Sequence, residues 1–215
     1  MKKILIAIFA LLPLAVSAQS EWTIPESAKK ADETTAAVAK EEKKSNKKDP
    51  KYLKGAAPLV NGEVQWTLDL DIPGQKAEQI YNRMYEYLEG LTKEENQLTG
   101  SQIALVNKKE NSFVTSIKEW QIYKQNAISI DRSITSYKIF TFCKDNHLTL
   151  TISRISFDYS ENVPHSVVYK AEEWISDEKA LNKKGTRIYP GSSKFRRKMI
   201  DRKDQIFNEV KALWK

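Results

Sequence analysis

The sequence has little of the chemistry that enzymes and metal sites need. Among its 215 residues there is one cysteine, Cys143, and there are two histidines, His147 and His165. A single thiol excludes an intramolecular disulfide framework and a zinc cluster built on several thiolates. No spacing links either histidine to Cys143 or to a serine, so neither a triad nor a metal site is indicated. We therefore expect no catalytic residue, no metal and no cofactor.

The chain also lacks an apolar run long enough to cross a membrane as a helix, which takes about 20 residues. Residues 4–14 are apolar, follow Lys2 and Lys3, and precede small side chains at positions 16–18. This pattern is typical of a secretory signal peptide over the first 18 residues. The alternative is an N-terminal anchor, which the short run disfavours. We expect a mature chain that begins at Gln19, has no transmembrane segment, and is exported to the periplasm or secreted.

Residues 19–51 are poor in apolar side chains and mix alanine, lysine and glutamate without a helical or strand period. Such a stretch cannot bury enough surface to offset the entropy of ordering it. It is interpreted as a disordered or weakly helical linker, followed by a single α+β domain over residues 52–215. The linker either tethers the domain away from a surface or is a solvated tail without a partner.

Hydrophobic periodicity divides residues 52–215 into strands and helices. Apolar residues alternate with polar ones from Val64 to Ile72, which predicts a strand with one buried face and one wet face. A shift in the apolar phase next to Arg154 predicts a β-bulge or a strong bend. The remaining expected elements are a helix at 75–93, strands at 102–107, 113–124, 129–143 and 147–159, a short edge strand at 167–169 and a short helix at 171–181.

The end of the chain, from Ser192 to Trp214, has the apolar stripe of an amphipathic helix. Ser192 or Ser193 is expected to cap its first turn. The strands upstream need an apolar partner, and this helix provides one. The fold class predicted is α+β, with the order strand, helix, four antiparallel strands and C-terminal helix, in which a curved sheet wraps the last helix.

Two segments resemble a known family. Residues 52–58 (YLKGAAP), with Asn61-Gly62 before the first strand, are similar to the family's opening, and residues 195–204 (FRRKMIDRKD) are similar to its close. The family is the bacterial domain-of-unknown-function family 4468, described as having a TBP-like fold. The resemblance covers about Tyr52 to Trp214. It implies an exported protein with the element order given above, and it implies no reaction. DNA binding is not carried over, because fold is a poor guide to function.

Positive charge is concentrated in the last helix. The chain carries a net charge of +7, and the span 191–215 has eight cations against three carboxylates. Lys194, Arg196, Arg197 and Lys198 lie in the first two turns, where each cation is disfavoured by up to about 1 kcal/mol. These four are our candidate anion-binding residues, for phosphate, an acidic glycan or lipid headgroups. The alternative is that internal carboxylates neutralise them: Glu172, Glu173, Asp177 or Glu178. Nucleic acid is disfavoured because the chain is exported and the helix lacks interleaved aromatic residues.

Large aromatic residues lie in or next to the expected elements. Trp66, Trp120, Trp214 and Phe195 are candidates for lining a cavity between sheet and helix that would bind an apolar ligand. The alternative is that they belong to the core. Asp69 and Asp71 share one face of the first long strand, but a glycosidase needs two carboxylates facing each other across a cleft, so we interpret them as solvated charges.

These observations favour a non-enzymatic binding domain of the cell envelope, with a small apolar or anionic ligand. The alternative is a structural or protein–protein interaction module that uses the sheet face or the basic C-terminal helix, with an envelope protein as its partner. No nucleic acid partner is expected.

Overall fold

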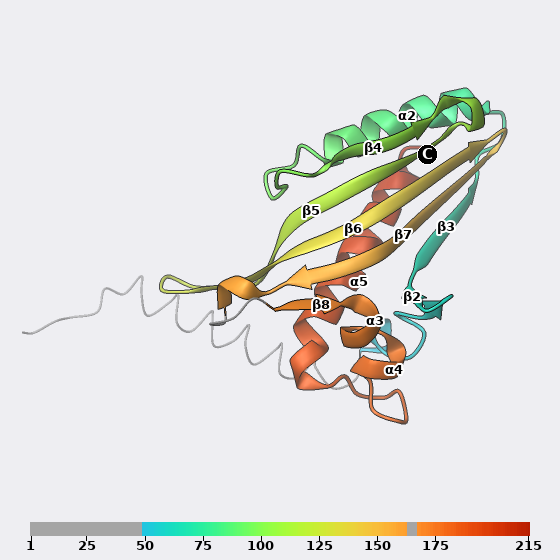
Figure 1. The fold of residues 1–215 in the computed structure, drawn as a ribbon. Coiled ribbons are helices and arrows are strands. Elements are labelled where there is room, and N and C mark those ends of the chain that lie inside the picture. Colours follow the sequence, from blue (N-terminus) through green and yellow to red (C-terminus); the bar gives the residue numbers. More distant parts are fainter. Residues whose placement is uncertain (1–48, 163–166) are drawn as a thin grey trace, which may run out of the picture. The chain divides into compact units, whose positions relative to one another are not determined.

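Six strands form one antiparallel sheet in the computed structural model, which describes residues 49–162 and 167–215 (Figure 1), and β1 and β2 form a separate two-stranded sheet. The order in the six-stranded sheet is β3-β7-β6-β5-β4, and β8 pairs with β7 beyond the end of β3. Tight hairpins join the longest strands, because each ends in turn residues. The bounds are β3 Trp66–Asp71, β4 Gln102–Asn107, β5 Ser112–Gln125, β6 Ile130–Lys144, β7 His147–Asp158 and β8 Val168–Lys170.

Helices and short elements complete the domain. Asn61 and Gly62 both have positive φ, at 53° and 83°, and they make the tight turn that the sequence predicts between β1 and β2. The bounds are η1 Pro50–Tyr52, β1 Leu59–Val60, β2 Glu63–Val64, α2 Ala77–Leu91, η2 Lys108–Glu110, η3 Ser160–Asn162, α3 Ala171–Trp174, α4 Asp177–Ala180 and α5 Pro190–Ala212.

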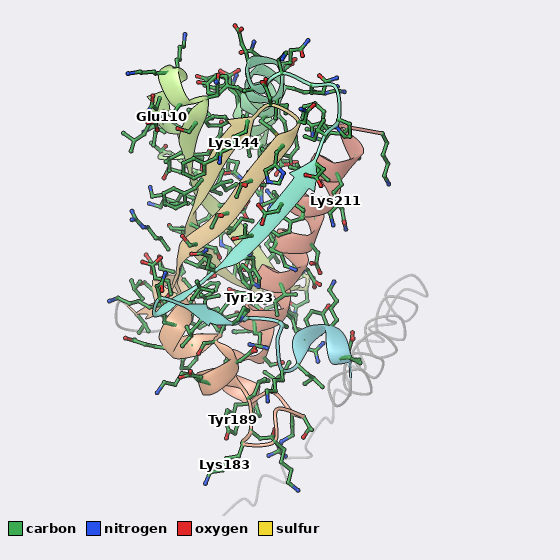
Figure 2. The ribbon with its side chains drawn as sticks, turned by 90° about the vertical axis from the view of Figure 1, so that its right-hand side faces the viewer. Glu110, Tyr123, Lys144, Lys183, Tyr189 and Lys211 are labelled. Carbon is green, nitrogen blue, oxygen red and sulfur yellow. The ribbon has the colours of Figure 1, made fainter. Side chains whose placement is uncertain are left out.

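Helices α2 and α5 cover the same face of the sheet, which we call the inner face. Alternate strand residues such as Ile117, Ile139 and Ile152 point into it and are almost completely buried, as are Phe195 and Met199 of α5. Figure 2 shows α5 running along the strands, with Tyr189 near its beginning and Lys211 near its end. The opposite, outer face carries polar side chains and partly exposed apolar ones.

The α+β fold, the order of strands and helices and the curved sheet over the C-terminal helix are confirmed. Three details differ. The expected helix at 171–181 is divided into α3 and α4 by Ile175 and Ser176. The last helix begins at Pro190, because proline is favoured at a first helical position. The expected serine cap is therefore wrong: Tyr189 is the N-cap, and Ser192 donates to its carbonyl oxygen at 3.3 Å.

The predicted signal peptide and most of the predicted linker lie outside the described residues, as does His165. Lys51, placed at the end of the linker, contacts α5: its Nζ is 2.6 Å from Asp201 Oδ1 and 3.1 Å from Asp204 Oδ2.

The bulge expected beside Arg154 is confirmed. The pairing of β6 with β7 shifts register between Ser136, which faces Ser156, and Lys138, which faces Ser153. Arg154 itself has a φ of +55°, in the left-handed region that residues with a side chain rarely adopt. The extra residue bends β7 and lets apolar side chains on both sides of the bulge stay on the inner face.

Replacing Arg154 tests this strained conformation. Arg154→Gly should retain the wild-type free energy of unfolding to within about 1 kcal/mol, because glycine adopts positive φ freely. Arg154→Val should be less stable than Arg154→Gly by about 1–2 kcal/mol, because a β-branched side chain is strained there. Urea denaturation of the two variants measures the difference. Equal stabilities would show that the chain relaxes away from the left-handed bulge.

Candidate functional site

Arg196, one of the four candidate anion-binding residues, is completely buried. Its Nη2 lies 2.6 Å from Asp177 Oδ1, and its guanidinium also donates to the carbonyl oxygens of Tyr52, Leu53 and Ile175 at 2.8, 2.8 and 2.5 Å. Asp177 is among the internal carboxylates considered as partners of this helix. The guanidinium thus joins the first turns of α5 to the segment that begins the domain and to the α3–α4 region.

The other three candidate cations point to different neighbours. Lys194 Nζ lies 2.8 Å from Asp131 Oδ2 on β6. The Arg197 guanidinium is 4.4 Å from the centre of the Tyr52 ring. Lys198 is exposed. Two of the four cations are therefore paired with carboxylates of this chain, and the set does not converge on one pocket.

The four candidate aromatic residues are also separated. Trp66 and Phe195 belong to the core and are 8% and 2% exposed. Trp120 points to the outer face, where the Arg132 guanidinium lies 3.8 Å from a ring centre of its indole. Trp214 is partly buried just after α5. Because the sheet lies between Trp120 and the core residues, the four do not line one cavity.

A second buried ionic centre lies between α5 and the inner face. Glu119 is 1% exposed and accepts hydrogen bonds from Arg202 at 2.8 Å, from Gln97 at 2.7 Å and from Tyr137 at 3.0 Å. Arg202 also donates to Glu94 at 2.6 Å. With its acceptors satisfied from several sides, this carboxylate is a structural group, since a buried charge is tolerated when it is paired and hydrogen-bonded.

One histidine and two carboxylate side chains that lie far apart in sequence meet on the outer face. His147 begins β7 directly opposite Asp71 of β3. Its Nδ1 lies 2.8 Å from Asp71 Oδ1, and its Nε2 lies 3.5 Å from Asp69 Oδ1. The hydrogen bond with Asp71, opposed by desolvation and assisted by Asp69, raises the pKa of His147. The group is a cross-strand clamp between the β3 edge and the rest of the sheet.

Cys143 is buried in β6, and burial raises the pKa of its thiol to about 12. Among the described residues, no group of three or more His, Cys, Asp and Glu side chains is arranged to hold a metal ion. Within the same residues, no helix has the length and apolar character needed to cross a membrane.

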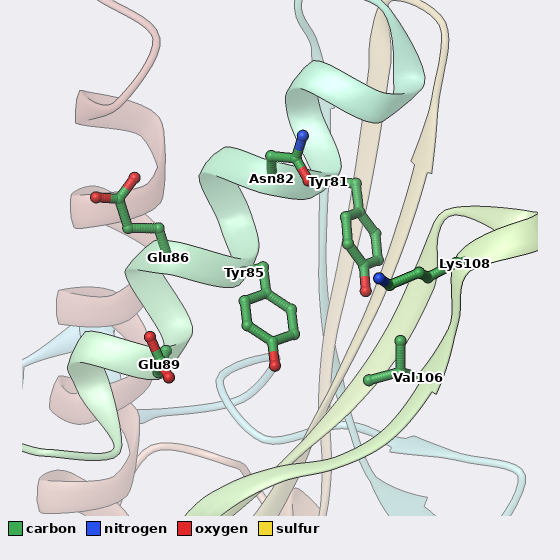
Figure 3. Close-up of a pocket in the computed structure, with 7 residues that line it drawn as sticks. All are labelled: Tyr81, Asn82, Tyr85, Glu86, Glu89, Val106 and Lys108. Carbon is green, nitrogen blue, oxygen red and sulfur yellow. The ribbon is translucent and has the colours of Figure 1, made fainter.

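A groove of about 600 Å³ lies between α2 and β4 (Figure 3), within the size range of small-molecule sites. One wall is one side of α2, formed by residues that lie three or four positions apart in the sequence and therefore face the same way. The other wall is the end of the edge strand β4 with the residue that follows it. The lining side chains are those of Tyr81, Asn82, Tyr85, Glu86, Glu89, Val106 and Lys108.

The floor of the groove is aromatic and firmly packed. The ring centres of Tyr81 and Phe113 are 5.2 Å apart in an edge-to-face arrangement, and those of Tyr85 and Phe113 are 5.5 Å apart. Tyr81 and Tyr85 stack on each other at 5.9 Å. Such pairs fix the orientation of each ring, so the groove has a preformed apolar base.

The Tyr81 hydroxyl is the unusual atom of this groove. The residue is 6% exposed, and its hydroxyl has no hydrogen-bond partner among the described residues. Of the residues lining the groove, it is the one with such a buried, unpartnered side-chain atom. Burial raises the pKa of Tyr81, so the hydroxyl keeps its proton and is available as a donor. Figure 3 shows this hydroxyl and the Lys108 side chain pointing toward one another.

Charge changes sign along the groove. A smaller pocket of about 290 Å³ continues it past Lys108, shares Tyr81 and Asn82 with it, and is also lined by the carboxylate of Glu78. Lys108 therefore marks the end near the beginning of α2. Glu86 and Glu89 lie toward the end of α2, at the opposite end of the groove. An elongated ligand in the groove meets a cation at one end and carboxylates at the other.

The comparisons with known proteins agree with this architecture. A model of the family "Domain of unknown function (DUF4468) with TBP-like fold" matches residues 66–158. A crystal structure of a DUF4468 family protein from Bacteroides ovatus is 34% identical, covers 78% of this chain and 95% of that chain, and has a TM-score of 0.72. The chain belongs to the DUF4468 family. The family resemblance stated from sequence is thereby confirmed.

A crystal structure of a TBP-like protein from Parabacteroides distasonis is 21% identical to the chain described here. It covers 72% of this chain and 94% of that chain, with a TM-score of 0.58. At that identity the likeness concerns the fold. No curated protein matches the chain. The residues matched by the family model run from the start of β3 to the end of β7, so all seven lining residues of the groove lie inside them, whereas the cations of α5 do not.

The sequence does not predict this groove, because its walls come from a helix and a strand whose adjacency depends on the strand order. The signal that was available is the composition of β4. Residues 102–107 (QIALVN) contain no charged side chain, which is unusual for a strand at the edge of a sheet.

Arg196 and Lys198 provide a matched pair of cations on α5. Arg196→Met should lower the free energy of unfolding by about 3–5 kcal/mol, because it removes the cation paired with Asp177 and a donor to three carbonyl oxygens. Lys198→Met, on the exposed side, should change it by no more than about 0.5 kcal/mol. Urea denaturation monitored by tryptophan fluorescence measures both. Similar effects of the two substitutions would show that the buried guanidinium does not anchor the helix.

The His147 clamp makes stability depend on pH. Because the folded-state pKa of His147 is raised, its contribution is fully present below the unfolded-state value near 6.5 and is lost as pH rises through the folded-state value. The wild-type protein should therefore lose stability relative to His147→Gln as pH is raised from about 5.5 to about 8.5. Urea midpoints of both proteins across this range test it, and any effect of His165 cancels in the comparison. Parallel curves would contradict the clamp.

Proposed function

We propose that this DUF4468 protein is an exported, non-enzymatic binding domain whose ligand occupies the groove between α2 and β4. The observation that carries the proposal is the buried Tyr81 hydroxyl without a partner. A buried polar group left unpaired costs about 1–3 kcal/mol. A ligand that offers an acceptor to this hydroxyl recovers that free energy, so the groove favours an occupied state.

The chemistry of the walls indicates the kind of ligand. The stacked rings of Tyr81 and Tyr85, together with Val106, offer an apolar base for the body of a ligand. The Tyr81 hydroxyl and the Lys108 ammonium group lie at one end and both donate hydrogen bonds. An apolar ligand with an anionic or hydrogen-bond-accepting end satisfies both features.

A binding role rather than a catalytic one is supported by the state of the potential reacting groups. Cys143 is buried and protonated, and a thiol rather than a thiolate is a weak nucleophile. Glu119 is enclosed by its hydrogen-bond donors. Export is supported by the charged start, the short apolar run and the small residues at positions 16–18.

Mass spectrometry of the full chain, expressed with its N-terminal segment and purified from the periplasm, tests the proposal. The denaturing spectrum should show a chain that begins at Gln19. The native spectrum should show an additional mass that disappears on denaturation. The same comparison is made on protein extracted from cells that produce it naturally. If the native and denatured masses are equal in that sample too, the protein retains no ligand and the proposal is contradicted.

Tyr81→Phe should separate ligand binding from stability. The substitution removes an unpaired buried hydroxyl, so the free energy of unfolding of the ligand-free protein should rise by about 1 kcal/mol, while the fraction of protein carrying the additional mass should fall. Tyr87→Phe on the same helix is the matched control, since the Tyr87 hydroxyl donates to Glu209 at 2.8 Å. It should lower the free energy of unfolding by about 1 kcal/mol and leave binding unchanged. Equal ligand occupancy in wild type and Tyr81→Phe would remove Tyr81 from the site.

A further inference from the structure

Strand β4 has an open edge. Among the described strands it pairs with β5 alone. In an antiparallel strand, alternate residues direct both backbone N–H and C=O groups toward one neighbour, and the residues between them direct theirs to the other side. The outward groups of β4 therefore form a row of donors and acceptors that an additional strand can pair with.

The two edges of the sheet differ in how they are protected. The β3 edge carries Asp69 and Asp71, and charged side chains on an edge strand oppose the addition of a further strand. The β4 edge has no charge, and Leu105 and Val106 are 67% and 47% exposed. Its protecting features are its short length, from Gln102 to Asn107, and a bulge between Ile103 and Leu105. Beyond that bulge the strand pairs regularly with β5 as far as Asn107.

Helix α2 lies alongside this edge and runs opposite to it in direction (Figure 1). Lys108, which follows the end of β4, lies near Tyr81 in the first half of α2, and Glu89 lies toward the other end. From Tyr81 to Glu89 the helix rises about 12 Å. That length matches about four residues of an extended chain at 3.3 Å each.

We propose that the groove takes an extended polypeptide segment, which adds to β4 as a further strand and packs alternate side chains against Tyr81 and Tyr85. This names the ligand class of the proposed function and rests on it. An apolar groove between a helix and an uncharged strand edge provides both parts of strand addition: backbone hydrogen bonds give affinity, and pockets for alternate side chains give specificity.

The charges at the two ends define the segment further. Glu86 is exposed at one end of the groove and favours a lysine or arginine of the partner. Lys108 and the donor hydroxyl of Tyr81 at the other end favour a carboxylate that stops short of Glu78, which lines the smaller pocket beyond them. The partner is therefore an extended segment with apolar residues two apart, a basic residue at one end and an acidic residue or a free C-terminus at the other.

A random heptapeptide library displayed on phage and selected on the mature chain is the probe. Selected peptides should show apolar residues two apart and a basic residue near one end. The same peptides, made synthetically with a fluorescent label, then allow single backbone N-methyl groups to be introduced along the sequence. Methylation should weaken binding by about tenfold at every second position and little at the positions between, because half of the amides pair with β4.

Matched charge reversals test the assignment to this groove. Glu86→Lys should weaken binding of the selected basic peptides by about tenfold or more. Glu63→Lys, an equal change of charge at an exposed position of β2, should leave it unchanged. Tyr81→Phe should also weaken binding.

Two results overturn strand addition. One is the absence of any enriched peptide, and the other is binding that is insensitive to the period of methylation or to Glu86→Lys. If the native mass spectrum then shows a ligand that is not a peptide and depends on Tyr81, the binding function stands and its ligand class is wrong. If neither a peptide nor a Tyr81-dependent mass is found, both proposals fail.

Discussion

The packing of α5 on the inner face of the sheet is the interaction on which the rest of the domain depends. Strands β5, β6 and β7 present a mainly apolar inner face, interrupted by buried polar groups such as Glu119, and each fully buried apolar side chain such as Phe195 or Met199 contributes about 1.5–3 kcal/mol. An exposed ion pair contributes about 0–1 kcal/mol. The apolar stripe therefore holds the helix, and the buried guanidinium of Arg196 fixes where along the sheet its first turns lie.

This arrangement decides which charges remain for binding. The cations at the start of α5 look available in the sequence, yet Arg196 and Lys194 pair with Asp177 and Asp131. Their positive charge near the helix N-terminus is unfavourable by itself and is offset by those carboxylates. A groove with an unpartnered buried hydroxyl, that of Tyr81, lies instead where the cover of the inner face ends, between α2 and the edge strand β4.

Much of the fold could be predicted from sequence because it rests on local patterns. The alternation from Val64 to Ile72 gives a one-sided strand, and the phase shift at Arg154 locates the bulge. The position of α5 follows from its apolar stripe. Its first residue did not follow, because serine is a preferred N-cap and tyrosine is not, so the sequence favours Ser192, whereas Pro190 at the first helical position places the cap at Tyr189.

The sites could not be predicted in the same way. Whether Arg196 binds an external anion or Asp177 depends on how α3–α4 returns to α5, which no local pattern encodes. His147 meets Asp71 because of the register of β3 with β7, and that register joins residues far apart in the chain. The groove exists because β4 lies at the sheet edge, and strand order likewise is a property of the whole domain.

Amide hydrogen exchange of the ligand-free mature chain tests the central claim, that the β4 edge next to the groove is open, most directly. The amides of β4 that point away from β5 should exchange at least about 100-fold faster than those of Phe113 and Ile117 in β5, because they lack a partner strand. Protection of all β4 amides to the same degree as those of β5 would show that the edge is already covered in the free protein, and the account of this groove would then be wrong.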